Sequence, residues 1–188
     1  MTDPTVKGAD GAELSVAERL ARLDSAIADG RLIRREWTEA PDERGRERAC
    51  LLAMLSPEAA REEDASRCPA SVMPTWLAQL TPWIDDSGSD AAWPVLVQRY
   101  ASLARRWHRL SPEQWDLLAH RVRELCVREL ALHMPHARSW APASTSVGIA
   151  FAATHKSPHP ALTGDRLGWA ILDAIDATCR EAESSLSS

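Results

Sequence analysis

The chain has 188 residues, of which 45% are hydrophobic and 26% are charged. These proportions are typical of a folded globular protein and exclude wholesale disorder. Twenty-two basic residues against 27 acidic ones leave a net charge of −5, whereas proteins that live on nucleic acid usually carry a basic excess. No apolar run approaches the roughly 18–20 residues that cross a bilayer, and the start of the chain lacks the apolar region of a secretory signal. We therefore expect a cytoplasmic protein without a membrane segment.

The length suits one ordinary domain with its own hydrophobic core. Residues 1–13 are rich in Gly and Asp without apolar periodicity, which predicts a flexible tail. Residues 14–184 are expected to form a single helical domain, and residues 185–188 are expected to fray.

Apolar residues recur at helical spacing in segment after segment, which predicts an all-α bundle of about six helices. The expected helices cover residues 16–29, 41–55, 71–84, 90–107, 111–134 and 165–182. The start signals are clearest at Ser15, which with Glu18 matches a capping box, and at Ser111, which precedes Pro112. Ser71 and Asp90 are the expected caps of two further helices.

Two segments lack the helical pattern. Residues 57–70 are polar and are expected to form a connecting loop. Residues 135–164 are rich in Pro, His and Ser, which predicts a long loop. Within that loop Val147, Ile149 and Phe151 alternate with small residues, a pattern that favours one short strand.

The cysteines are too far apart in sequence to form a recognised site. No C-x-x-C motif is present, so neither a zinc knuckle nor a thioredoxin-like redox pair is indicated. We expect reduced thiols that act as small hydrophobic residues in the core. The four positions are Cys50, Cys68, Cys126 and Cys179.

Histidines are the strongest metal-ligand candidates, because four of the six lie close together in sequence. They are His133, His136, His155 and His159. Prolines interrupt both pairs and no carboxylate or cysteine completes a familiar ligand spacing, so a solvated loop is the favoured interpretation. We expect no metal and no cofactor.

A second candidate metal site is formed by Asp85, Asp86 and Asp90, but their spacing is not that of a calcium-binding loop. A turn followed by a helix cap explains these aspartates better. The sequence also lacks the G-x-S-x-G, P-loop, G-x-G-x-x-G and H-E-x-x-H patterns. No residue is therefore assigned a catalytic role, and we expect a protein that is not an enzyme.

Tryptophan is unusually common, with eight residues against one Tyr and one Phe. Six of them fall on core-facing phases of the expected helices: Trp76, Trp83, Trp93, Trp107, Trp115 and Trp169. Trp37 and Trp140 lie in linkers, where exposure is easier.

Arginines surround two of the tryptophans, and exposed Trp among Arg side chains is a feature of interface hot spots. The candidate protein-binding residues are Arg31, Arg34, Arg35, Trp37, Arg105, Arg106 and Arg109. The competing interpretation is that these arginines cover apolar surface with their stems, and that Trp37 closes one end of the bundle.

These observations favour a non-enzymatic helical factor that binds another protein. By analogy of class, immunity proteins and phage anti-defence (anti-CRISPR-like) inhibitors are examples. Two alternatives are a metal-dependent hydrolase that uses the His133–His159 region and a nucleic-acid-associated regulator that uses the Arg patches. The acidic total argues against nucleic acid, and the sequence leaves the oligomeric state open.

Overall fold

The computed structural model describes residues 13–86, 89–133 and 164–186. Over these residues the chain is 67% helical, with seven α-helices and one two-stranded sheet, which confirms the predicted all-α fold. The segment expected to carry a short strand, around Val147, lies outside the described residues. The same holds for most of the predicted N-terminal tail.

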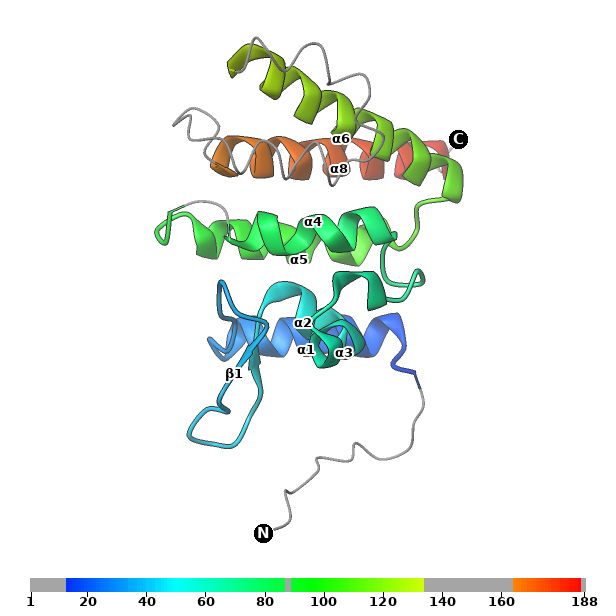
Figure 1. Ribbon diagram of the computed structural model, residues 1–188. Coiled ribbons are helices and arrows are strands. Elements are labelled where there is room, and N and C mark those ends of the chain that lie inside the picture. Colours follow the sequence, from blue (N-terminus) through cyan, green and yellow to red (C-terminus); the bar gives the residue numbers. More distant parts are fainter. Residues whose placement is uncertain (1–12, 87–88, 134–163, 187–188) are drawn as a thin grey trace.

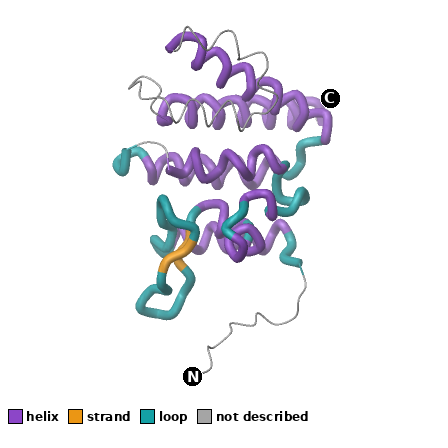
Figure 2. Tube along the Cα trace, viewed as in Figure 1, coloured by secondary structure: helices purple, strands orange, loops and turns teal. Residues whose placement is uncertain are grey.

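The helices are stacked in layers (Figure 1; Figure 2). The amino-terminal layer holds α1 (Val16–Ala28), α2 (Leu51–Leu55), α3 (Pro57–Glu62), the 3-10 turn η1 (Ala65–Arg67) and the strands β1 (Thr38–Glu39) and β2 (Arg48–Ala49). The middle layer holds α4 (Thr75–Asp86) and α5 (Trp93–Trp107), and beyond it lie α8 (Gly164–Leu186) and then α6 (Pro112–His133). Contacts run from α1 to α5 and from α8 to each of α4, α5 and α6.

The two strongest predicted helix starts are confirmed. The Ser15 hydroxyl accepts a hydrogen bond from the Glu18 N–H while the Glu18 carboxylate accepts one from the Ser15 N–H, which completes the capping box of α1. The Ser111 N–H donates to the Gln114 side chain at 2.8 Å, and Pro112 opens α6. Gly30, at φ +64°, ends the first helix in the left-handed conformation.

The helix predicted over residues 41–55 is wrong in its first half. Residues 38–49 form a β-hairpin that projects from the amino-terminal layer (Figure 2). Its backbone also pairs with the preceding segment, because Ala49 bridges Thr38 on one side and Leu32 on the other. Residues 41–49 are mostly charged and have no apolar face, and Gly45 turns the chain at φ +72°.

The loop predicted over residues 57–70 is also partly wrong. The Ser56 hydroxyl accepts a hydrogen bond from the Ala59 N–H, Pro57 occupies the first helical turn, and α3 follows. Five consecutive apolar residues of α2, from Leu51 to Leu55, lie in the core just before it.

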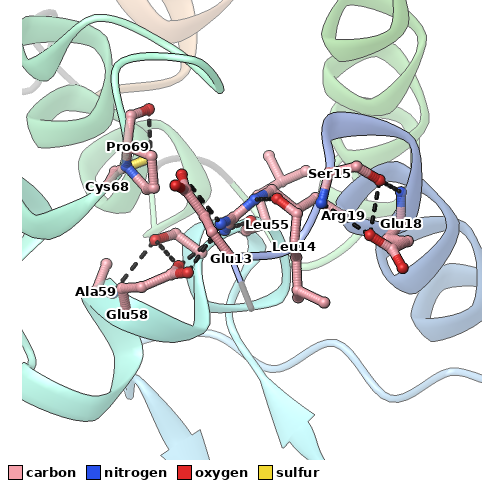
Figure 3. Close-up of polar contacts among 11 residues, drawn as sticks. Glu13, Leu14, Ser15, Glu18, Arg19, Leu55, Glu58, Ala59, Cys68 and Pro69 are labelled. Carbon is pink, nitrogen blue, oxygen red and sulfur yellow. Dashed lines mark hydrogen bonds and ion pairs between the residues drawn. The ribbon is translucent and has the colours of Figure 1, made fainter. Parts of the chain in front are cut away.

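A buried arginine joins α1 to α3 (Figure 3). The Arg19 side chain is fully buried, and its guanidinium donates to both Glu58 carboxylate oxygens at 2.8 Å. It also donates to the carbonyl oxygens of Leu14 and Leu55, at 2.9 and 3.0 Å. This bidentate pair satisfies a charge that would otherwise be costly to bury.

Two predicted caps in the middle layer are wrong. Ser71 lies in a turn in which the Val72 N–H donates to the Pro69 carbonyl, and α4 begins only at Thr75. Asp90 does not cap α5, whose N-cap is Ala92 without a side-chain hydrogen bond. The Ser89 hydroxyl accepts from the Ala92 N–H at 3.2 Å in the turn before the helix.

Ion pairs join α8 to its neighbours. Arg106 of α5 pairs with Glu183 at 2.9 Å and with Asp176, and Arg121 of α6 pairs with Glu181 at 3.1 Å. The helix extends to Leu186, beyond its predicted end at residue 182.

The tryptophans line the core to different degrees. Trp107 is fully buried and its indole N–H donates to the Val72 carbonyl at 3.1 Å. The other five predicted core tryptophans are only partly buried against the core: Trp76, Trp83, Trp93, Trp115 and Trp169. Trp140 lies outside the described residues.

None of the described helices is long and apolar enough to cross a membrane.

Candidate functional site

The segment of residues 31–37, here called the linker, joins α1 to the hairpin, and its side chains point to two different places. The Arg31 guanidinium donates to the Glu47 carbonyl and to the Ser25 hydroxyl, both at 2.9 Å, on the α1 side. Arg35 and Trp37 instead line a small cavity beside α4. The four linker residues predicted to bind a partner therefore do not form one patch.

Arg34 fastens the linker to the end of α4. Its guanidinium donates to the carbonyl oxygens of Asp85 and Asp86, at 3.2 and 3.0 Å, and pairs with the Asp90 carboxylate at 2.6 Å. It also lies over the Trp93 ring, 5.8 Å from its centroid. A cation at a helix carboxyl end is favoured by the helix dipole, so Arg34 holds the fold together at this point.

The cavity beside α4, here called the Trp37 cavity, has a volume of about 80 Å³. Trp37 is half-buried against the core, which matches the interpretation that it closes one end of the bundle. Arg35 is exposed and has a left-handed backbone with φ +72°, and its N–H donates to the Asp86 carboxylate at 2.7 Å. The lining residues are Arg35, Glu36, Trp37, Cys50, Pro82, Asp85 and Asp86.

Asp85 is a buried carboxylate at the wall of this cavity, only 1% exposed. Its oxygens accept hydrogen bonds from the Leu51 N–H at 3.1 Å and from the Trp93 indole N–H at 2.8 Å. Burial raises the pKa of Asp85 to about 7, and the neighbouring Asp86 carboxylate adds to that effect. The sequence predicts a turn at Asp85, whereas the structure places this residue in the last turn of α4, buried against the core.

A larger opening, here called the α1 groove, lies between α1 and the hairpin and has a volume of about 510 Å³. Three of its lining residues are apolar, namely Leu14, Ala21 and Met54. The other five are polar or charged: Glu18, Arg22, Ser25, Arg31 and Glu47. Protein-binding surfaces combine apolar and polar side chains in this way. Of the predicted linker residues, Arg31 is the one that belongs to this groove.

The hairpin beside the groove is internally braced. The Asp42 carboxylate accepts hydrogen bonds from the backbone N–H groups of Arg44 and Arg46 and from the Arg46 guanidinium, at 2.8–2.9 Å. Arg46 in turn pairs with Asp29 at the end of α1, at 2.7 Å. A loop held in this way loses little conformational entropy on binding.

The second predicted Arg patch is dispersed. Arg105 pairs with Asp24 of α1, whereas Arg106 pairs with Glu183 of α8. Arg109 is exposed, and the neighbouring Trp107 points into the core. The structure therefore does not bring these three arginines together around an exposed tryptophan.

The groups considered for chemistry are placed as follows. All four cysteines are free and buried, and burial raises the pKa of the Cys50 thiol to about 12 and of the Cys68 and Cys179 thiols to about 11. Within the described part of the chain, no group of three His, Cys, Asp or Glu side chains could hold a metal ion. Of the candidate histidines, His136, His155 and His159 lie outside that part, and His133 is the final residue of α6. The absence of a metal site at these histidines stays a prediction.

Comparison of the chain with models of known protein families, with curated proteins and with solved structures finds no match.

The sequence did not reveal the α1 groove or the Asp85 site, because both depend on contacts between residues far apart in the chain.

Proposed function

We propose that the protein is a non-enzymatic binding protein that holds a segment of a partner protein in the α1 groove. The observation that carries this proposal is the groove itself, with its mixed apolar and charged lining and the braced hairpin beside it. Its volume, about 510 Å³, is large enough for one or two apolar side chains of a partner. Ligand pockets of this kind span roughly 300–1,000 Å³.

The charges that line the groove favour a protein over a nucleic acid as the occupant. Glu18 and Glu47 lie beside Arg22 and Arg31, and a polypeptide can offer both signs of charge to such a mixed lining, whereas a phosphate backbone offers one. Arg22 and Glu47 pair with each other at 2.6 Å on the surface. Exposed pairs contribute little stability, so they can exchange partners at low cost. The expected ligand is an apolar residue flanked by acidic and basic side chains.

A binding protein without a catalytic role has its effect by changing what its partner does. It would then be an inhibitory or accessory factor, as immunity proteins and phage anti-defence inhibitors are, which is an analogy of class.

Two matched variants test the proposal. Ala21 and Ala17 are both exposed on α1, one turn apart, and only Ala21 lines the groove. A photo-reactive side chain at Ala21 identifies the partner, which is then purified. We expect Ala21→Arg to weaken its binding by about tenfold or more, which equals about 1.4 kcal/mol, while Ala17→Arg leaves binding unchanged. Both variants should keep the wild-type melting temperature.

The proposal is wrong if the purified partner binds both variants equally well. It is also wrong if crosslinkers placed at Ala21 and at Ser25 capture no protein from the native host.

A further inference from the structure

Asp85 occupies a place where three parts of the fold meet. It belongs to the last turn of α4, it accepts a hydrogen bond from the first N–H of α2, and it accepts another from the indole of Trp93 at the start of α5. The N-cap residue of α2, Cys50, makes no side-chain cap. The Asp85 carboxylate therefore supplies from another helix the acceptor that a capping side chain would normally provide.

We propose that Asp85 is a proton-operated joint between the amino-terminal layer and the α4–α5 layer, which tightens when its carboxyl group is protonated and loosens when it is ionised. This inference does not rest on the proposed binding function.

The surroundings decide the direction of the effect. The two donors that reach the carboxylate, the Leu51 N–H and the Trp93 indole, are neutral. Arg34 directs its hydrogen bonds to the carbonyl oxygens of Asp85 and Asp86 and pairs with Asp90. A buried carboxylate with neutral donors carries a large desolvation cost. In agreement, burial raises its pKa to about 7. The cost of burial thus outweighs the Trp93 and Leu51 hydrogen bonds and the weaker attraction of Arg34, which all favour the ionised form.

The neighbouring groups do not remove this cost. The thiol of Cys50 and the hydroxyl of Tyr100 stay neutral around pH 7, because burial raises the pKa of each, to about 12 for Cys50. In the described part of the chain, the charged or titratable groups that lie around Asp85 are Arg34, Arg35, Glu36, Cys50, Asp86, Asp90 and Tyr100.

The Trp37 cavity gives the ionised form a way to recover hydration. It borders Asp85, and its volume of about 80 Å³ is room for a few water molecules. Hydration of the carboxylate from this side competes with the Leu51 and Trp93 hydrogen bonds. Loosening therefore begins at the start of α2 and at the start of α5.

The test follows the wild-type protein by nuclear magnetic resonance from about pH 5 to about pH 9. We expect the Asp85 carboxyl carbon to titrate near neutral pH, and the Leu51 amide and Trp93 indole resonances to move with the same midpoint. The protection of the Leu51 amide against hydrogen exchange should fall by about tenfold or more as the pH rises from about 5 to that midpoint, and it should stay level above it.

Asp85→Asn removes the titrating group, so the protection of the Leu51 amide should become independent of pH. Asp116→Asn, at an exposed aspartate of α6, is the matched control and should keep the wild-type dependence. The proposal is overturned if Asp85 titrates below about pH 5, near its ordinary range, or if Leu51 and Trp93 do not follow it. Those wild-type measurements decide the question even if Asp85→Asn does not fold.

Discussion

The guanidinium of Arg19 and the carboxylate of Glu58 form a bidentate ion pair across 39 residues of sequence, with both hydrogen bonds at 2.8 Å. Arg19 is completely buried, and Glu58 is about one third exposed. The same guanidinium satisfies the carbonyl oxygens of Leu14 and Leu55. Arg19 thus connects the start of α1, the end of α2 and the start of α3.

Arg19→Met is expected to lower the free energy of unfolding by about 3 kcal/mol, because it leaves a carboxylate and two carbonyl groups without their donor. Arg22→Met, which removes a half-exposed partner of Glu47, is the control and should cost no more than about 1 kcal/mol. Urea denaturation at neutral pH measures both. Equal effects of the two substitutions would show that the buried Arg19–Glu58 pair contributes no more stability than the exposed Arg22–Glu47 pair.

The pH dependence of the same pair follows from Glu58. The Arg19 hydrogen bonds lower the pKa of Glu58 from 4.5 to about 2. Its contribution is therefore fully present above pH 4.5 and is lost as the pH falls through about 2. Glu58→Gln should show a shallower loss of stability over this acid range than the wild type, in denaturation curves recorded at a series of pH values.

Trp107 and Trp115 should differ in their contributions to stability, although both lie on predicted core-facing phases. Trp107 is 1% exposed and packs edge-on against Tyr100 with ring centroids 5.1 Å apart. Trp107→Ala should cost about 3–5 kcal/mol. Trp115 is only half-buried, so Trp115→Ala should cost about 1–2 kcal/mol. Thermal unfolding of the two variants would contradict the assignment if Trp115→Ala had the larger effect.

Arg34→Glu is expected to destabilise the fold by about 2 kcal/mol or more, because it places a carboxylate against the carbonyl end of α4 and beside Asp90. Arg44→Glu at the exposed hairpin turn should change stability by no more than about 0.5 kcal/mol. A wild-type melting temperature for Arg34→Glu would show that the linker is not fastened to α4.

Arg35→Gly tests the predicted binding role of the linker without damaging the fold. Arg35 is exposed and has φ +72°, a conformation that glycine adopts without steric cost. The substitution should keep or raise stability by up to about 1 kcal/mol, whereas Arg35→Ala should not raise it. A loss of partner binding by Arg35→Gly, with the melting temperature retained, would assign this side chain to the interface.

The thiols should be unreactive in the native state. All four cysteines are buried, and Cys50, Cys68 and Cys179 have raised pKa values of about 11–12, so little thiolate exists at neutral pH. A disulfide reagent should modify no cysteine in the folded protein and all four in denaturant. Rapid modification of any one of them in the native protein would show a reactive thiol that the structure does not account for.

The sequence predicted elements whose signals are local. Ser15 and Ser111 mark helix starts through side chains three residues away, and these starts are confirmed. The hairpin has no comparable local signal, because its residues are mostly charged and lack apolar alternation. It depends on Asp42 binding backbone N–H groups and on Ala49 pairing with two segments.

The candidate site depends on contacts that local patterns do not encode. Arg34 reaches Asp85 across 51 residues and Arg31 reaches Glu47 across 16, so neighbours in the linker face different surroundings. Arginines that lie near a tryptophan in the sequence therefore need not gather around it in the folded protein.

The position of α8 between α6 and the α4–α5 layer has a consequence for synthesis on the ribosome. Until α8 has emerged, α5 and α6 lack the helix that packs against both of them. In the nascent chain α1 to α4 can already pack together, while α5 and α6 still wait for α8. Chaperone binding during translation should therefore concentrate on the α5–α6 region and end once residues 164–186 leave the exit tunnel.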